Sequence, residues 1–549
     1  MGKYNAETEV AWNRTGNTVT TLPAYIYVPP GTYLIKKPIQ MLVNTFLIGD
    51  PLNLPTLVAR PALEANPVIN GYDAHQGEAS ANKNFYMAVR NFKIDTTRIA
   101  NNVVGRAIEW SVSQACSLTN VHINMPASSA HVGVTMDQGG SGKIIADCSF
   151  TGGAIGLQLA NQQYMLKALT FDGCGVGIFI QRSFVSTIQG CTFTNCNYGV
   201  DMSAPDSSGA LSIVDSSVSK CTAGVHAYVS GNGQGSLVLD GFAVSDAVAV
   251  KSSNGSTLLQ GSVPDGQVWV MGNTPPGLLV DGKYLTAPLP QYEKYDISQV
   301  VSIKDDPSIP CAAAVGIWNT VLRVGGSADS LVTTSCGSPD TATCKAAFAL
   351  LHLAPSASSA YLEDVWGWTA DHSLDGPARD PPQNIAVGRG ALVESAGPTW
   401  LVGTSFEHCT LYQYALRGAR DVYVGQQQTE APYWQGVGTA RRAPAPWAVN
   451  ASWGDPGFGN CAGAVEDDDR CYRAWGVYMV NSSRVVVHGS AMWSFFNGMD
   501  DGQWSDPQCG ATGGICQTNM AFVEGARATW WFSVSSKAAE NLVVDVGEG

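Results

Sequence analysis

Two glutamates in one aromatic stretch are the residues of this sequence best placed to do chemistry together. Glu407 and Glu430 lie between Trp400 and Trp434, and each follows a short apolar run that ends in glycine. The spacing between the two glutamates differs by a single position from the spacing between the two glycines. Paired carboxylates in an aromatic-lined groove suit glycoside hydrolysis, because one can protonate the leaving oxygen while the other activates water.

The first half of the chain carries an internal repeat of similar length. Four segments, the first of which begins at Cys148, align in one register with a period of roughly 20 to 25 residues. The aligned positions are Phe150, Phe171, Phe193 and Val218, together with the glycines Gly156, Gly177, Gly199 and Gly224. Short strands with this period are typical of a parallel β-helix, in which each coil buries its face against its neighbours. Cys174, Cys196 and Cys221 occupy equivalent positions, so we expect a column of small buried side chains without chemistry of their own.

Residues one repeat apart in such a solenoid lie above one another, so we expect the two glutamates to share one face. Neighbouring coils are separated by roughly 4.8 Å. Carboxyl groups that lean apart on them would reach the roughly 6.5 to 9.5 Å that an inverting glycosidase uses. From spacing alone, two solvated surface charges are the more common outcome. The neighbouring rings of Trp400, Tyr433 and Trp434 favour a sugar-binding face, although such rings also fill β-helix cores.

Composition and charge bound the fold and the partners. The 549 residues are too many for one ordinary core, and 45% hydrophobic residues, 14% charged residues and 59 glycines indicate a folded, turn-rich, all-β protein. The net charge of −14 is spread over the chain without a basic stripe, which disfavours nucleic acid and anionic membranes as partners. A neutral polysaccharide is compatible with this charge. We expect a monomer without a cofactor.

The cysteines and glycosylation sequons suggest a secreted protein. The 14 cysteines allow disulfides, and we expect Cys461 to pair with Cys471 and Cys509 with Cys516. Four sequons, at Asn13, Asn254, Asn450 and Asn481, would accept glycans in a secretory pathway. The N-terminus shows no apolar signal region, and no apolar run is long enough to suggest a membrane span. Between a cytosolic protein and a secreted one whose true start lies upstream, we favour the second.

The chain divides into two repetitive halves. Residues 1–272 hold the first array, and residues 273–299 are proline- and tyrosine-rich and suggest an ordered linker. Residues 300–549 resume short strands, interrupted at 373–383 and 436–470 by segments that we expect to be loops. The acidic run from Glu466 to Asp469 could bind Ca²⁺ but is more typical of a solvated turn. The histidines show no zinc-ligand spacing.

Stretches spread over most of the chain match one known family. They read P-P-G-T-Y-L-I, N-T-F-L-I-G-D-P, R-N-F-K-I-D-T-T, L-A-N-Q-Q-Y, L-H-L-A-P-S-A-S-S-A-Y-L-E-D-V-W-G-W-T-A-D-H, G-P-T-W-L-V-G-T-S-F-E-H and Q-T-E-A-P-Y-W. These stretches resemble glycoside hydrolase family 55, the exo-acting β-1,3-glucanases best known from fungi. The resemblance implies two tandem right-handed parallel β-helices side by side, with the active site between them. It also implies hydrolysis with inversion that releases glucose from the non-reducing end of β-1,3-glucan.

The resemblance assigns roles to individual residues. Glu430, in Q-T-E-A-P-Y-W, looks like the general acid, and Glu407, in S-F-E-H, looks like the carboxylate that helps to activate water. In the family, groups of the first β-helix also hold this water. The positions of this chain that resemble them are Gln162 or Gln163, and Ser186. Trp368, Asp371 and Tyr433 resemble the family's residues that bind the terminal glucose. The neighbouring ring of Trp434 is a further candidate for substrate binding.

The chain also departs from this family. Each β-helix of the family opens with a segment like G-A-K-G-D-G-x-T-D-D-T, which is missing before Pro23 and again after Val301, and the end at Gly549 comes early. We therefore expect a truncated or mis-spliced gene product. Two alternatives remain. One is a pectin-active lyase or hydrolase, which would require either a Ca²⁺ site with a basic residue or several closely grouped aspartates. The other is a non-catalytic carbohydrate-binding β-helix or an inactive remnant of the enzyme.

Overall fold

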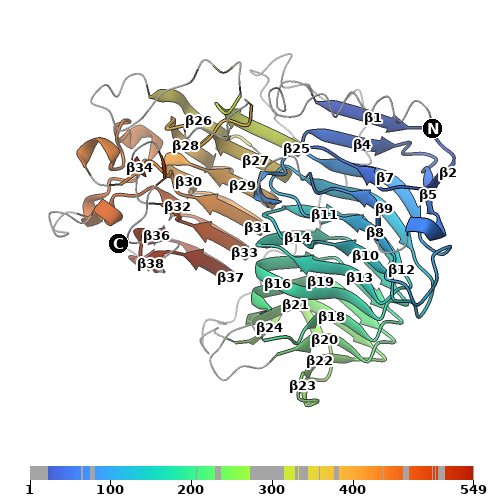
Figure 1. Cartoon of the computed structure of the whole chain (residues 1–549). Helices are drawn as coiled ribbons and strands as arrows, with labels where there is room; N and C mark the ends of the chain where they lie inside the picture. Colours follow the sequence, from blue (N-terminus) through green and yellow to red (C-terminus); the bar gives the residue numbers. More distant parts are fainter. Residues whose placement is uncertain are drawn as a thin grey trace.

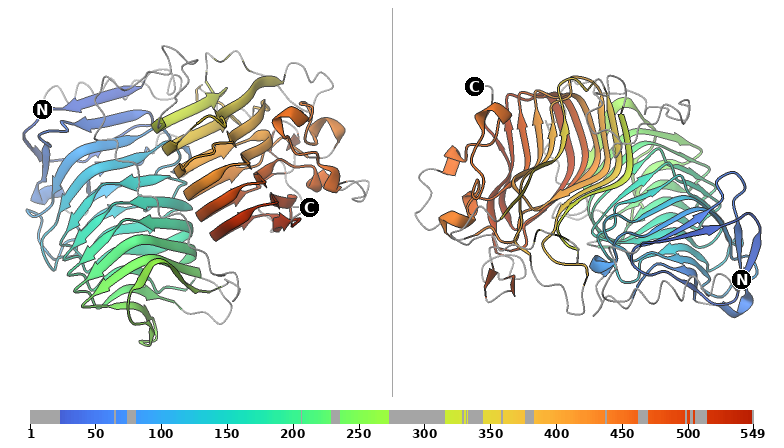
Figure 2. Two further views of the ribbon diagram at one scale, coloured as in Figure 1. Left: turned by 180° about the vertical axis from the view of Figure 1, so that it is seen from behind. Right: turned by 90° about the horizontal axis from the view of Figure 1, so that it is seen from above.

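Two stacks of strands lie side by side in the computed structural model (Figure 1; Figure 2). It describes residues 23–63, 66–73, 81–205, 207–228, 236–272, 315–327, 330, 332, 344–357, 359–375, 383–436, 438–461, 469–496, 499–500, 503–504 and 514–547. Strands coloured blue to green form the first stack, and strands coloured yellow to red form the second. The predicted all-β fold with parallel sheets is confirmed, whereas two tandem right-handed β-helices stay a prediction.

The first stack is one network of 24 strands. It contains β1 (Ala24–Val28), β2 (Thr32–Ile35), β3 (Ile39–Gln40), β4 (Thr45–Gly49), β5 (Thr56–Ala59), β6 (Pro67–Asn70), β7 (Ala88–Asp95), β8 (Arg106–Glu109), β9 (Ser117–Asn124), β10 (Val132–Thr135), β11 (Ile144–Ala146), β12 (Ser149–Thr151), β13 (Ile155–Ala160), β14 (Gln163–Lys167), β15 (Thr170–Asp172), β16 (Val176–Gln189), β17 (Thr192–Thr194), β18 (Tyr198–Met202), β19 (Ser208–Ser219), β20 (Ala223–Ala227), β21 (Ser236–Ser245), β22 (Val248–Ser252), β23 (Thr257–Leu259) and β24 (Val263–Met271). Successive layers pair in parallel until β21–β24 and β22–β23, which pair antiparallel at the end of the stack.

The second stack consists of two parallel sheets of six strands each. One sheet contains β25 (Val315–Val324), β27 (Ala360–Thr369), β29 (Thr399–Glu407), β31 (Arg420–Glu430), β33 (Ser483–Trp493) and β37 (Arg527–Lys537). The other contains β26 (Lys345–Leu353), β28 (Ala386–Val393), β30 (Cys409–Arg417), β32 (Trp475–Val480), β36 (Gln517–Glu524) and β38 (Ala539–Asp545). The chain alternates between the two sheets, so each pair of strands adds one layer.

Short elements connect these layers. A small antiparallel pair is formed by β34 (Met499–Asp500) and β35 (Gln503–Trp504), and the 3-10 turns are η1 (Pro61–Leu63), η3 (Ala81–Lys83), η6 (Thr439–Arg441), η7 (Ala451–Trp453), η8 (Gly459–Cys461) and η9 (Asp469–Cys471). The described part of 436–470 contains such turns and no strand, as predicted for a loop. No helix in the described residues is long and apolar enough to cross a membrane.

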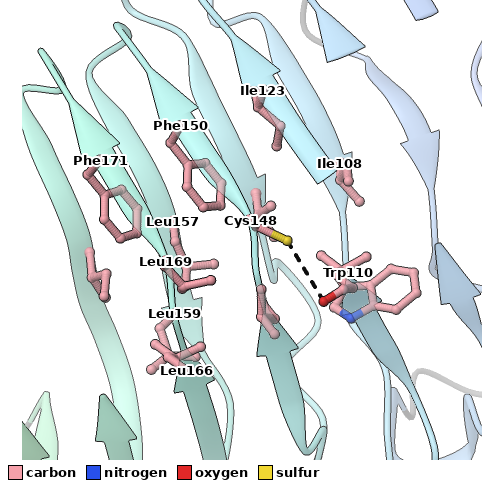
Figure 3. Close-up of a cluster of buried hydrophobic side chains, with 14 of the residues drawn as sticks. Ile108, Trp110, Ile123, Cys148, Phe150, Leu157, Leu159, Leu166, Leu169 and Phe171 are labelled. Atoms are coloured by element: carbon pink, nitrogen blue, oxygen red, sulfur yellow. Dashed lines mark hydrogen bonds between the residues drawn. The ribbon is translucent and has the colours of Figure 1, made fainter. Parts of the chain in front are cut away.

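The predicted repeat register of the first stack is confirmed. Phe150 pairs with Phe171, and Phe171 pairs with Phe193, on adjacent strands. Their rings stack at centroid distances of 4.8 and 5.0 Å. Figure 3 shows two of these rings beside the leucines of the same interior. The predicted cysteine column is also buried, and the Cys196 amide donates to the Cys221 sulfur at 3.3 Å. A column of rings and a column of thiols therefore run through this interior beside its aliphatic side chains.

From β7 onward in the first stack and throughout the second, a left-handed residue bends the chain at the same register position of successive layers. In the first stack these residues are Asn91, Asn120, Asp147, Ala168, Gly190, Asp215 and Gly241, and in the second they are Asn319, Asp364, Gly403, Gln426, Gly489 and Ser533. Asn, Asp and Gly dominate both columns because they tolerate positive φ best. In the first column, the Asn120 side-chain amide donates to the side-chain oxygen Oδ1 of Asn91 at 2.9 Å. The bends let each layer turn a corner at the same place.

The two stacks are joined by a buried interface. The strands β14 and β16 of the first stack contact β29, β31 and β33 of the second. One apolar cluster brings Ile144, Ala146 and Met165 of the first stack against Tyr361, Trp400, Val402, Tyr423 and Val486 of the second. Polar bonds also cross it: Lys167 pairs with Glu363 at 2.7 Å, and His488 pairs with Asp240 at 3.0 Å. The interface therefore combines an apolar, aromatic-rich cluster with polar side-chain pairs.

Some sequence predictions fall on undescribed residues. The predicted linker 273–299 lies outside the described residues, so the domain boundaries stay a prediction. The Cys461–Cys471 disulfide is confirmed. Cys516 is disulfide-bonded, but its predicted partner Cys509 lies outside the described residues.

Candidate active site

The two glutamates lie in one column at the ends of neighbouring strands. Glu407 closes β29 and Glu430 closes β31, and the two residues are direct partners in the parallel pairing. Trp368 on β27 pairs with Glu407, and Trp493 on β33 pairs with Glu430. The predicted stacking of the two carboxylates is thus confirmed. The register offset is constant along this pair of strands, so Gly425 pairs with Val402, and the glycines that precede the two glutamates are not in register.

Several donors converge on the Glu430 carboxylate. The Tyr433 hydroxyl donates to Oε2 at 2.5 Å, and the Gln428 amide donates to Oε1 at 2.9 Å. The Nε2 atom of His408 lies 3.4 Å from Oε2. The residue is 7% exposed. Its buried carboxyl oxygens are therefore satisfied by hydrogen bonds from neighbouring side chains.

Glu407 is more deeply buried and takes its partners from both stacks. The Ser405 hydroxyl donates to Oε1 at 2.5 Å, and the Gln114 amide of the first stack donates to the same atom at 3.2 Å. Glu407 is 2% exposed. Burial raises the pKa of Glu407, and the neighbouring charge of Glu430 raises it further, while Lys143 and His408 act against both effects.

A second polar chain crosses the interface beside the glutamates. The side-chain amide of Gln163, at the start of β14, donates to the side-chain oxygen Oε1 of Gln428 at 3.0 Å. The Lys143 ammonium, 1% exposed, donates to that same oxygen. Burial lowers the pKa of Lys143, and the carboxylates of Glu407 and Glu430 oppose this shift. The first stack therefore reaches Glu430 through Gln428.

His408 and Asp371 form the polar edge of the site. Burial disfavours the charged form of His408, but the carboxylates of Asp371 and Glu430 outweigh it and raise the His408 pKa to about 9. Burial also opposes ionisation of Asp371, yet His372 and His408 hold its pKa below the usual range. His372 lies 3.0 Å from Asp371. Carboxylate and imidazolium charges thus alternate from Asp371 through His408 to Glu430.

The predicted sugar-gripping residues lie around this edge, with one exception. The Trp368 indole donates to Asp371 at 3.2 Å, and its ring stacks on Trp366 with centroids 4.9 Å apart. The Tyr433 ring lies 4.6 Å from that of His408. Burial and the charge of Glu430 raise the pKa of Tyr433 well above its usual value, so its hydroxyl stays a donor. Trp434 instead packs in a separate buried cluster with Cys344 and Ala386.

Of the residues predicted to hold the water, one contacts the glutamates' hydrogen-bond network and the others do not. Gln163 reaches the glutamates through Gln428. Gln162 is half-buried, and its carbonyl accepts from the Phe184 amide at 2.9 Å. Ser186 is fully buried, and its hydroxyl shares a 2.7 Å hydrogen bond with Ser183. Its strand position pairs with Tyr164, which belongs to the interior of the first stack, so the structure does not bring Ser186 to the carboxylates.

Sequence reasoning missed four contributors to the site. Gln428 stands two residues before Glu430, and His408 directly follows Glu407, so proximity in the chain could have identified both. Lys143 and Gln114 lie 285 and 293 residues from the residues that they contact. No local pattern marks them, because the docking of the two stacks creates their role.

The acidic run predicted as a turn or Ca²⁺ site is described only at its end. Residues 466–468 lie outside the described residues, and the Asp469 carboxylate pairs with Arg442. In the part of the chain that the structure describes, no group of three or more His, Cys, Asp and Glu side chains is arranged to hold a metal ion.

Comparisons with known proteins agree with this fold. Residues 8–201 match the family described as rhamnogalacturonase A/epimerase, pectate lyase-like. The catalytic unit of a GH87 α-1,3-glucanase from Streptomyces thermodiastaticus covers 94% of this chain and 64% of its own, at 9% identity and a TM-score of 0.26. That TM-score is too low to support any inference. The parallel sheets and the family match together indicate a pectate-lyase-like fold.

Curated relatives narrow the resemblance. The chain is 27% identical to a glucan 1,3-beta-glucosidase of Cochliobolus carbonum, over 96% of this chain and 83% of the relative. It is 26% identical to a probable glucan endo-1,3-beta-glucosidase of Arthroderma benhamiae, over 96% and 86%. It is 28% identical to the non-secreted LysM effector LysM15 of Penicillium expansum over 96% of this chain, but spans only 46% of that relative. The resemblance to β-1,3-glucanases of pectate-lyase-like fold is confirmed.

Proposed function

We propose that this chain hydrolyses β-1,3-glucan from the non-reducing end with inversion and releases glucose. The observation that carries the proposal is the register pairing of Glu407 with Glu430, both buried, between the rings of Trp368 and Trp493. Relatives named as 1,3-β-glucosidases support the substrate class. In this proposal the two stacks are tandem right-handed parallel β-helices of a secreted protein.

The site supplies the groups that such a reaction needs. Glu430 acts as the general acid toward the glycosidic oxygen, and Glu407 accepts the proton of the attacking water. The Tyr433 hydroxyl orients the Glu430 carboxyl group, which it contacts at 2.5 Å. Trp368 and Asp371, which are joined by a hydrogen bond, bind the terminal glucose through ring stacking and hydroxyl contacts.

One observation favours a second assignment in which the two roles are exchanged. Burial and the charge of Glu430 raise the pKa of Glu407, which suits a proton carrier. Glu430 accepts donors from Tyr433 and Gln428, which suits a carboxylate that accepts a proton from water. Both assignments predict inversion, so kinetics on different leaving groups must separate them.

The primary test is glucose release from laminarin, with the anomer followed by NMR. Wild-type protein should release α-glucose, and Glu430→Gln should lower the rate by about 100- to 10,000-fold, the usual worth of a general acid or base. Release of β-glucose would contradict inversion. If a folded wild-type chain bound laminarin but released nothing, a non-catalytic carbohydrate-binding protein would be the better description.

The size of the products distinguishes exo from endo action, and the choice of leaving group identifies the general acid. An exo-acting enzyme should yield glucose without intermediate oligosaccharides, whereas an endo-acting one, as some relatives are named, should yield a ladder of oligosaccharides. A nitrophenyl β-glucoside needs little protonation at its leaving oxygen. The variant of the true general acid, Glu430→Gln or Glu407→Gln, should therefore recover activity on this substrate, and the variant of the base should not.

A further inference from the structure

Lys143 is a buried cation at the site that the proposed chemistry leaves without a role. It lies just before β11, at the inner surface of the first stack, and is 1% exposed. A buried ammonium is costly unless it is paired and hydrogen-bonded. Its hydrogen bond goes to Gln428, across the interface, rather than directly to a carboxylate. The residue that it contacts is in turn bonded to Glu430.

The chemistry of this contact fixes the orientation of an amide. Below the pKa of about 7 to which burial lowers Lys143, its side chain is an ammonium, which donates hydrogen bonds and cannot accept them. The Gln428 atom that faces it must then be the side-chain carbonyl oxygen. Gln163 donates to the same oxygen at 3.0 Å. The other end of the side chain, its NH₂ group, must then face Glu430, which it contacts at 2.9 Å. Without the ammonium, this orientation would depend on Gln163 alone, whose amide also donates to the Ser141 backbone carbonyl at 3.3 Å.

We propose that Lys143 is a positioning residue, which locks the Gln428 amide so that it always donates to Glu430 and holds that carboxyl group in its reactive orientation. This role rests on the proposed hydrolysis of β-1,3-glucan. It also makes the geometry of a carboxyl group on the second stack depend on a cation of the first.

The test compares kcat and KM on laminarin for four proteins. Lys143→Met should lower kcat by about 100-fold, the order expected when a reacting group is misplaced by about 1 Å, with KM changed by less than about threefold. Lys143→Arg keeps a pure donor and should retain more of kcat than Lys143→Met. Lys167→Met is the matched control, because Lys167 also crosses the interface, to Glu363, but is not part of the chain to Glu430. Its kcat should stay within about threefold of wild type.

A double-variant cycle shows whether Lys143 acts through Gln428. In a Gln428→Met background the amide is gone, so Lys143→Met should change kcat by less than about threefold. Two effects that simply multiply would overturn the proposal, because Lys143 would then act independently of Gln428. Lys143→Gln is the second variant to use if Lys143→Met does not fold, since its amide both donates and accepts and cannot fix the orientation.

The pH profile gives a readout that a purely structural role would not move. Removing the Lys143 cation takes away a charge that lowers the pKa of Glu407. The limb of the profile that belongs to Glu407 should therefore move to higher pH in Lys143→Met and stay in place in Lys167→Met. Wild-type activity with unchanged kcat in Lys143→Met would refute the positioning role alone. A wild-type chain inactive on every β-1,3-glucan would refute the proposed hydrolysis, and the positioning role with it.

Discussion

At the scale of single residues, His408 links Asp371, one of the proposed glucose-binding residues, to Glu430. Its ring lies between Asp371, 3.6 Å from Nδ1, and Glu430, 3.4 Å from Nε2. Two carboxylates on either side of one imidazole favour its protonated form, in spite of burial. A buried histidine held in its charged form makes the stability of the protein depend on pH.

This dependence gives a prediction for His408→Asn. The folded-state pKa of about 9 is above the ordinary value of about 6.5, so the stabilisation is fully present below about pH 6.5 and is lost as the pH rises through about 9. The difference in free energy of unfolding between wild type and variant should therefore shrink by about 3 kcal/mol from pH 6 to pH 10, in denaturant titrations.

His122 provides a control of opposite sign. Burial, aided by Lys93, lowers the pKa of His122, so its wild-type contribution becomes more favourable as the pH rises through the ordinary histidine range. His122→Asn should accordingly show no loss of its stability difference at high pH. A His408→Asn difference that stays constant with pH would mean that folding does not raise the pKa of His408.

Sequence could identify those site residues whose contacts follow the repeat. Glu407 and Glu430 lie one coil offset apart and pair in register, whereas Trp368, which pairs with Glu407, was indicated by the resemblance and not by the repeat. Trp434 was predicted from the rings around the glutamates, whereas its indole donates to the carbonyl of Ile385 in a neighbouring core, a contact that no repeat reveals. Lys143 could not be found at all, since its partner lies 285 residues away and is reached by docking rather than by the repeat.

At the scale of elements, the left-handed bends decide how closely the stacks approach. Gly489 bends β33 at φ +96°, and a Cβ there would come within 2.5 Å of the Thr187 hydroxyl on the first stack. That hydroxyl donates to the His488 carbonyl at 2.6 Å. The bend column and the interface therefore coincide. Gly403 is one of these bend residues and aligns with Gln426 rather than with Gly425.

Gly489→Ala should consequently destabilise the protein more than an equivalent change elsewhere. Alanine in the left-handed region costs about 1–2 kcal/mol, and displacing the Thr187 hydroxyl costs about 1 kcal/mol more. Gly418→Ala is the matched control, because Gly418 has φ +59° but no atom within 4 Å of its Cβ position. Thermal unfolding should show a larger drop in Tm for Gly489→Ala. Equal drops would mean that backbone strain alone decides the cost.

At the scale of the whole molecule, the site exists because two stacks meet. Gln114, Lys143 and Gln163 come from the first stack, whereas both glutamates and the rings beside them come from the second. The repeat pattern predicted the parallel layers of each stack, since every coil buries its side chains on the next. The repeat pattern could not predict which faces of the stacks pack together, because the outward-facing residues of the strands do not follow the repeat.

The strand β14 offers a direct test of this coupling between docking and chemistry. Met165 and Leu166 are adjacent and fully buried, but they point to opposite sides. Leu166 fills the interior of the first stack, and Met165 lies in the interface cluster. A Cβ on either Gly403 or Gly425 would approach Met165 to 3.3 Å. Met165 also shares its face of the strand with Gln163, which reaches toward Glu430 through Gln428.

Met165→Ala and Leu166→Ala should each cost about 2–5 kcal/mol of stability, because both leave a cavity. Only the first cavity loosens the contact that places Gln163 and Lys143 against Gln428. At a temperature well below either transition, kcat on laminarin should therefore fall about tenfold or more in Met165→Ala and stay within about threefold of wild type in Leu166→Ala. If both variants lost activity in proportion to their loss of Tm, catalysis would depend on overall stability rather than on the fit between the stacks.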